Sequence, residues 1–245
     1  MSLRAIDRRS LPDRVFEQLT AEIVGGRYDA GSAIPSEREL SEALQVNRHV
    51  VREAIKRLEQ IGLVRVTQGG RTTVLDYRRT AGLDLLALVA EHVEPADELA
   101  PLLAAALEMR AGIGADVARL CAERSPRSAG AELVEIAALL AEATSAEQLL
   151  ELDERFWQRA LDGAGNLAYQ LAFNSLIRAV HAQRELSVPL LEEELRHSGH
   201  RAPIAEAIAA GDSQAAERAA RAALAAAAPS PARLRPKGKA ARHER

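Results

Sequence analysis

Basic side chains gather on one side of a helix-forming segment at residues 48–60. Arg48, His49, Arg52 and Lys56 fall on a shared face if this segment is helical. An arginine on such a face can donate two parallel hydrogen bonds to the edge of a guanine, and arginine or lysine binds backbone phosphate by charge. The chemistry that these residues predict is the reading of double-stranded DNA.

Two short helices and a hairpin are predicted to position that face. Ser36 and Glu39 form a capping-box pattern before the first helix, and Asn47 is a favourable N-cap for the second. Apolar residues recur at helical spacing: Leu40, Ala43 and Leu44 in the first helix, and Val51, Ala54, Ile55, Leu58 and Ile61 in the second. After Gly62 the pattern becomes extended, so the segment reads as a winged helix-turn-helix.

The predicted wing has strands at residues 63–67 and 71–75 around a glycine-containing tip. Glycine lets the backbone approach a phosphate or enter the minor groove, while Gln68 and Arg71 supply hydrogen bonds and charge there. A capping box, a solvated basic helix and a glycine turn are each common alone. Their order along one short segment is what predicts DNA binding.

Residues 34–64 resemble the GntR family of bacterial transcription regulators. The resemblance rests on collinear motifs: IPSEREL at 34–40, VNR at 46–48, VREA at 51–54, RL at 57–58 and GLV at 62–64. It implies operator contacts from Arg38, from residues 48–52 and from the wing tip. The full predicted DNA-binding set is Ser36, Arg38, Asn47, Arg48, His49, Arg52, Lys56, Gln68, Gly69, Gly70 and Arg71. His49 departs from the family, where a small or hydroxyl side chain is common.

Composition and charge indicate the fold class and the distribution of charge along the rest of the chain. The 245 residues are 47% hydrophobic but only 3% aromatic, which favours close-packed helices in one or two domains. Residues 1–79 carry a net charge of +3, residues 80–228 carry −11 and residues 229–245 carry +5. The predicted DNA-binding module is therefore basic and the larger part of the chain acidic. A single cysteine, Cys121, in an apolar helical pattern predicts a buried thiol in a reducing cytoplasm.

The fold class that we expect is mostly α: an N-terminal winged helix-turn-helix with a small β-hairpin wing, and an all-α antiparallel bundle. The helix before the motif starts at Ser10, and residues 1–75 form the DNA-binding domain, with a linker at 76–80. Eight helices are predicted in residues 81–228, at 81–91, 96–123, 128–142, 146–162, 166–186, 188–198, 203–210 and 212–227. Residues 229–245 are predicted to be a disordered basic tail, and no segment is apolar enough to cross a membrane.

The helical part resembles the ligand-sensing domain of the FadR subfamily within the GntR family. Many members bind a divalent metal there through an aspartate, a histidine four residues later and two further histidines. Asp153 matches the aspartate, but Trp157 stands at the next ligand position and His200 is about one residue out of register. An indole has no lone pair for a metal, so we predict no metal site of that type and no cofactor.

The resemblance extends to the fatty-acid regulator that names the subfamily, through Arg110 and the order of Tyr169 and Asn174 after a Gly-Asn pair. It implies a long-chain fatty acyl-CoA as effector. The predicted effector-binding set is Arg110, Asp153, Trp157, Tyr169, Asn174 and His200. A lone Asp or Arg on an amphipathic helix is also compatible with a solvated or salt-bridged surface residue, and Tyr169 with a core residue.

These observations predict a cytoplasmic transcription regulator that binds a palindromic operator as a homodimer, with a small-molecule effector and no membrane partner. A regulator sensing a small carboxylate, with or without metal, and a constitutive repressor without effector are the alternatives. An enzyme is the rival class, but no nucleophile, metal cluster or phosphate-binding loop appears in the sequence.

Overall fold

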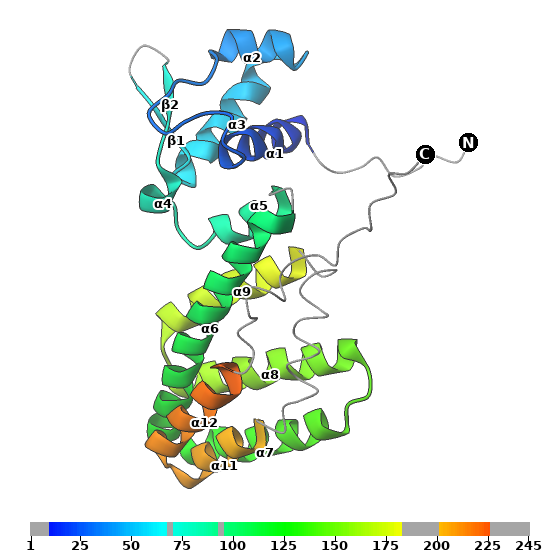
Figure 1. Ribbon diagram of the computed structural model, residues 1–245, viewed down its shortest axis with the longest axis vertical. Helices are drawn as coiled ribbons and strands as arrows, with labels where there is room; N and C mark the ends of the chain where they lie inside the picture. Colours follow the sequence, from blue (N-terminus) through cyan, green and yellow to red (C-terminus); the bar gives the residue numbers. More distant parts are fainter. Residues whose placement is uncertain (1–9, 68–70, 93–95, 183–200, 226–245) are drawn as a thin grey trace, which may run out of the picture. The chain divides into compact units, whose positions relative to one another are not determined.

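The computed structural model describes residues 10–67, 71–92, 96–182 and 201–225. It divides into two units by its internal contacts, Met1–Glu94 and Pro95–Arg245. The first unit begins with the helices α1 (Leu11–Val24), α2 (Glu37–Ala43) and α3 (Arg48–Gln60) (Figure 1). Each begins after a polar N-cap, Ser10, Ser36 or Asn47, whose side chain accepts a hydrogen bond from a backbone amide of the first turn. The predicted helix starts are confirmed.

The core of the first unit lies between α1 and α3. It contains Val15, Phe16, Leu19 and Ile23 of α1 and Val50, Val51, Ala54, Ile55 and Leu58 of α3. The apolar stripe predicted for α2 is only partly correct, since Leu40 is buried but Ala43 is exposed. The second helix is seven residues long, so one turn of it faces the core.

The wing consists of β1 (Val64–Val66) and β2 (Thr72–Val74), which pair antiparallel with Val66 opposite Thr72. The segment before α2 also lies beside β2, because the Ile34 amide donates to the Thr72 carbonyl at 3.0 Å. At the same end of the hairpin, on the neighbouring strand, Glu59 Oε1 accepts a hydrogen bond from the Val66 amide at 2.8 Å, which ties the wing to the end of α3. The wing tip lies outside the described residues.

The predicted linker at 76–80 contains one helical turn, α4 (Tyr77–Thr80), and is followed by α5 (Leu85–His92). Helix α5 packs against α1, although its residues were expected to open the helical domain. The contacts therefore place the division of the chain after residue 94 rather than at the polar segment.

The second unit is built from helices only, within the described residues. They are α6 (Ala96–Arg124), α7 (Pro126–Glu142), α8 (Ala146–Ala164), α9 (Leu167–Ala182), α11 (Arg201–Ala210) and α12 (Ser213–Ala225). Helix α6 runs along α12 and α8, and α7 packs against α8 and α11 (Figure 1). These bounds agree closely with the predicted helices and confirm the fold class. The helix predicted at 188–198 lies outside the described residues.

The core of this unit is made mostly of alanine and aliphatic side chains around Phe156, with Cys121 fully buried among them. Burial raises the pKa of the Cys121 thiol to about 11, so the thiol stays protonated at neutral pH. No helix in the described part of the chain is long and apolar enough to span a membrane.

Candidate functional site

The outer face of α3 carries the basic residues that the sequence places there. Arg48, His49, Arg52 and Lys56 are all exposed, while the apolar side chains of the opposite face are buried. Asn47 begins the helix, with its side chain accepting a hydrogen bond from the Val50 amide at 3.0 Å. The first turn of α3, capped by Asn47, therefore presents its basic groups on the exposed face, as a base-reading helix requires.

Several of these basic groups already have acidic partners. Arg52 pairs with Glu37 on α2, Lys56 Nζ lies 2.8 Å from Glu53 and Arg38 lies 3.6 Å from Glu42. The hydrogen bonds from Arg52 hold the pKa of Glu37 below its ordinary value. Arg48 makes no salt bridge within the described part of the chain.

The turn between α2 and α3 sets the angle at which α3 is presented. Gln45 adopts a left-handed backbone with φ of 53°, and the Val46 amide donates to the Ser41 carbonyl at 3.1 Å. Ser36 Oγ accepts from the Glu39 amide and donates to the Glu39 carboxylate at 2.7 Å, so its role in the described residues is to cap α2. Arg71 is exposed beside β2, whereas Gln68, Gly69 and Gly70 lie outside the described residues.

A small pocket in the second unit is lined by two of the predicted effector-binding residues, Arg110 and Trp157. The other lining residues come from α6, α8 and α9: Ile113, Gly114, Val117, Leu161, Phe173 and Leu176. The cavity measures about 20 Å³, which is room for one water-sized group. Gly114 lets Trp157 and Leu224 pack closely against α6, because a Cβ there would lie 3.2 Å from the indole ring and 2.5 Å from Leu224.

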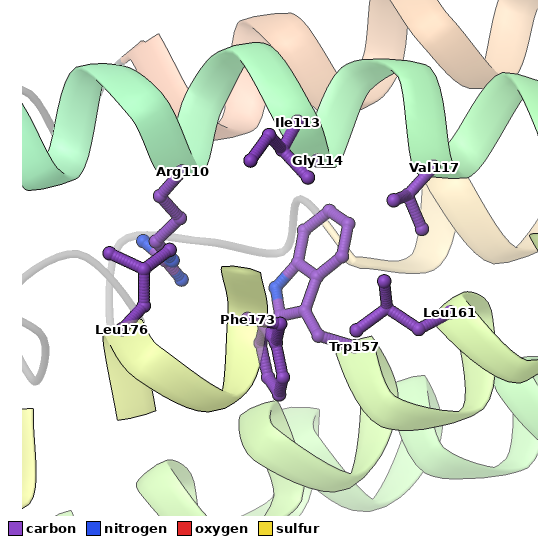
Figure 2. A pocket seen from close by; sticks show the side chains of 8 residues that line it. All are labelled: Arg110, Ile113, Gly114, Val117, Trp157, Leu161, Phe173 and Leu176. Atoms are coloured by element: carbon purple, nitrogen blue, oxygen red, sulfur yellow. The ribbon is translucent and has the colours of Figure 1, made fainter. Parts of the chain in front are cut away.

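Trp157 brings a polar atom into this apolar setting. The side chain is 4% exposed, and its indole Nε1 has no hydrogen-bond partner within the described residues. Figure 2 shows this nitrogen on the side of the ring that faces Arg110 and Leu176. A buried donor without an acceptor costs about 1–3 kcal/mol, so a ligand acceptor at this point would be favoured.

Asp153, next to the pocket, joins three helices through two arginines. Its Oδ2 accepts a hydrogen bond from Arg110 of α6 at 3.0 Å. Its Oδ1 accepts from Arg201 Nε at 2.8 Å and lies 2.7 Å from Arg201 Nη2, at the start of α11. Arg201 is 2% exposed, and its guanidinium carbon lies 5.4 Å from the centre of the Trp157 ring. Asp153 and Arg110 are thus parts of a buried ion-pair cluster rather than solvated surface residues.

These groups do not fit the divalent metal found in many FadR-like domains. Both oxygens of Asp153 are taken by guanidinium groups, and Trp157 offers no lone pair. A metal ion at Asp153 would have to displace Arg201 or lie against its positive charge. In the residues that the structure describes, no group of three or more His, Cys, Asp or Glu side chains could hold a metal.

Two further predicted effector residues, Tyr169 and Asn174, do not line the pocket. Tyr169 donates a hydrogen bond from its hydroxyl to Asp116 at 3.0 Å, and this bond raises the pKa of Tyr169. Asn174 is exposed and accepts from Gln170 at 3.1 Å. His200 lies outside the described residues.

Sequence reasoning missed Glu37, Arg201 and Phe173. The partners of Glu37 and Arg201 lie 15 and 48 residues away in the chain, so helical spacing carries no sign of either pair. Phe173 has the apolar character of any core residue. For Arg201, the only signal in the sequence is its position among segments that are predicted to form apolar helices.

Comparisons with known proteins agree with this architecture. Residues 11–74 match the family of bacterial regulatory proteins called gntR, and residues 105–226 match the FCD domain. The HTH-type transcriptional regulator Mce2R of Mycobacterium tuberculosis is 37% identical over 225 residues, which is 90% of this chain and 91% of that protein.

A fatty acid metabolism regulator protein of Proteus mirabilis is 31% identical over 162 residues, 65% of this chain and 65% of that protein. Among solved structures, that of Lar, which controls the Listeria monocytogenes agr system, covers 91% of this chain and 97% of its own. Its TM-score is 0.57 at 15% identity, a likeness of fold.

Proposed function

The chain belongs to the GntR family of bacterial transcription regulators, and from that premise we propose that it binds an inverted-repeat operator as a homodimer in the cytoplasm. It carries a DNA-binding helix-turn-helix domain and a ligand-binding FCD domain. The observation that carries DNA reading is the exposed basic face of α3, with Arg48 and Arg52 as base contacts and Arg38 and Lys56 as phosphate contacts. Two copies related by a two-fold axis would read two half-sites.

The effector that we propose is a long-chain fatty acyl-CoA, bound in the FCD domain. Support comes from relatives named fatty acid metabolism regulator, and from a pocket that combines apolar walls with the Arg110 guanidinium and the Trp157 indole N–H. These two groups suit a carbonyl or an anionic group at the edge of an apolar chain.

The small size of the pocket suggests how this ligand would control DNA binding. A cavity of about 20 Å³ cannot hold an acyl chain, so binding must separate parts of α6, α8 and α9. The ligand would then prefer the opened arrangement of these helices over the closed one. Only such a difference in affinity can shift a protein between two arrangements, and here it would change how the two DNA-reading domains are held.

A second candidate effector is a small carboxylate, which the size of the cavity and the charge of Arg110 favour. A carboxylate that replaces a water-sized group would need little widening of the pocket. The same experiment separates the two candidates.

The test is operator binding with and without effector. DNA selected by the protein from a random duplex pool would be titrated in the presence of palmitoyl-CoA, free coenzyme A, palmitate or citrate. We expect palmitoyl-CoA alone to weaken binding. A response to citrate alone would move the assignment to the small carboxylate, and no response to any of the four compounds would indicate a constitutive repressor.

Replacing Trp157 by Phe keeps an aromatic ring in the pocket and removes only the N–H donor. The concentration of palmitoyl-CoA needed to release DNA is expected to rise about tenfold, which corresponds to one lost hydrogen bond of about 1.4 kcal/mol. Phe156→Tyr, a buried aromatic change on the same helix, tests whether any disturbance of α8 has this effect. An unchanged response in Trp157→Phe would remove Trp157 from the binding site.

A further inference from the structure

We infer that Glu37 is a positioning residue for Arg52: it holds the side edge of the guanidinium, formed by Nε and Nη2, and leaves the end edge, formed by Nη1 and Nη2, to read a guanine. The inference rests on the proposed reading of DNA by α3. Glu37 is the first residue of α2, and Arg52 lies one turn into α3, so this pair joins the two helices of the motif.

The contact is made by two neighbouring nitrogens of the guanidinium. Arg52 Nε lies 3.1 Å from Glu37 Oε1 and 3.2 Å from Oε2, and Nη2 lies 2.8 Å from Oε2. The carboxylate therefore occupies the side edge of the guanidinium, formed by Nε and Nη2. This two-pronged geometry fixes the orientation of the planar group as well as its position.

The rest of the guanidinium is available for a second partner. Arginine has five N–H donors in a rigid fork, and the side-edge contact with Glu37 uses those of Nε and Nη2 that point toward it. The end edge still has one N–H on each terminal nitrogen. A guanine offers O6 and N7 as paired acceptors in the major groove, and two parallel N–H groups match them. Arg52 can thus hold Glu37 and a guanine at the same time.

Positioning of this kind acts before DNA arrives. An arginine loses rotamer freedom when it binds a base, and part of that loss is removed if a neighbour already holds the side chain. Arg52 is exposed by 57% and Glu37 by 33%, and within the residues that the structure describes no other hydrogen bond or salt bridge holds the guanidinium in one orientation.

The charge of Glu37 works against affinity for DNA in general. A carboxylate beside a DNA-binding arginine repels the phosphate backbone and cancels part of the positive field. The benefit of Glu37 should therefore appear as discrimination between sequences rather than as tight binding to any duplex. This separates positioning from a merely structural role, since a structural defect would weaken binding to all sequences.

A neighbouring ion pair provides the matched control. Glu53 pairs with Lys56 at 2.8 Å, is 38% exposed, and lies on α3 itself three residues from its partner. Glu53→Gln removes the same negative charge as Glu37→Gln from the same region. It leaves the contact between Glu37 and Arg52 untouched.

The experiment uses the full chain and duplex DNA. The parent protein selects its preferred sequence from a random duplex pool. Dissociation constants are then measured for that sequence, for variants with each G·C pair replaced, and for an unrelated duplex. The proteins are the parent, Glu37→Gln, Arg52→Ala, the double variant and Glu53→Gln, and circular dichroism checks that each is folded.

Arg52→Ala is expected to lose about 10–100-fold discrimination at one G·C pair, the worth of one bidentate contact. Glu37→Gln should lose about tenfold at the same pair, while it binds the unrelated duplex at least as tightly as the parent. The double variant should discriminate no less than Arg52→Ala, because both changes act through one contact. Glu53→Gln should keep the discrimination of the parent.

Other outcomes would overturn the inference. If Glu37→Gln discriminates as the parent does while Arg52→Ala does not, Arg52 reads DNA without help from Glu37, and the proposed function stands. If Glu37→Gln binds the selected sequence more tightly and more selectively, Glu37 competes with the DNA instead of assisting. If Arg52→Ala discriminates as well as the parent, Arg52 reads no base, and the proposed role of Arg52 falls together with the inference.

Discussion

A single carboxylate, Asp153, holds three helices of the second unit together. Its two oxygens accept from Arg110 on α6 and Arg201 on α11, and Asp153 itself lies on α8. Buried charges are costly unless each one is paired and hydrogen-bonded. The cluster therefore needs all its members, and removal of one leaves the others with the cost of burial.

The variant Arg201→Ala tests how much this cluster contributes to stability. We expect the free energy of unfolding of the second unit to fall by about 3 kcal/mol, because Asp153 stays buried and loses its contacts to Arg201. Trp157 is the only tryptophan of the chain and lies beside Arg201, so its fluorescence during urea unfolding reports on this unit directly.

Arg221→Ala is the control, since Arg221 forms an exposed pair with Glu217 at 2.9 Å and should contribute less than about 1 kcal/mol. A cost for Arg201→Ala no larger than that for Arg221→Ala would contradict the structural importance of the cluster. Because Asp153 and Trp157 do not suit a divalent metal, addition of EDTA to the parent protein should leave the unfolding curve unchanged. A destabilisation by EDTA would contradict our conclusion that these residues hold no metal.

At the scale of elements, the sequence predicted best where the signal is local. Ser36 and Asn47 start helices because a side chain three residues before an amide can cap it, and spacing alone reveals this. Long-range pairs such as Glu37 with Arg52 depend on how α2 crosses α3, which periodicity does not report. The same reason explains why Arg201 was missed and why α5, expected with the bundle, packs on α1.

The junction after α3 depends on Gly62. Its φ is +77°, and a Cβ on this residue would lie 2.6 Å from the backbone oxygen of Thr80. Thr80 also donates a hydrogen bond from its hydroxyl to the Gly62 carbonyl at 2.7 Å. A glycine is therefore needed here both for its backbone conformation and for the close approach of α4.

Gly62→Ala should destabilise the first unit by more than about 2 kcal/mol, since the left-handed conformation costs about 1–2 kcal/mol and the clash with Thr80 adds to it. Gly26 provides the control, because it has the same φ of +77° with open space where a Cβ would lie. Gly26→Ala should show the conformational cost alone. Calorimetry of the full chain measures both, and equal losses in the two variants would show that the approach to Thr80 carries no cost.

At the scale of the whole molecule, charge is distributed unevenly along the chain. Residues 1–79 carry +3 and residues 80–228 carry −11, so attraction to phosphate must come from local basic faces rather than from net charge. Binding through such contacts releases counterions, and each phosphate contact makes the affinity steeper in salt. The salt dependence therefore counts the contacts that the proposed DNA-reading surface makes.

Arg71→Ala should reduce the slope of log K against log salt by about 1 for each copy that binds DNA, because Arg71 is exposed beside the wing and is proposed to contact phosphate. Arg127→Ala, a change at an exposed arginine of the second unit, should leave the slope unchanged. Deletion of residues 229–245, which carry +5, should also leave it unchanged if this basic segment serves solubility alone. A decrease of several units in this slope after the deletion would show instead that the segment contacts DNA. An unchanged slope in Arg71→Ala would remove Arg71 from the phosphate-binding surface.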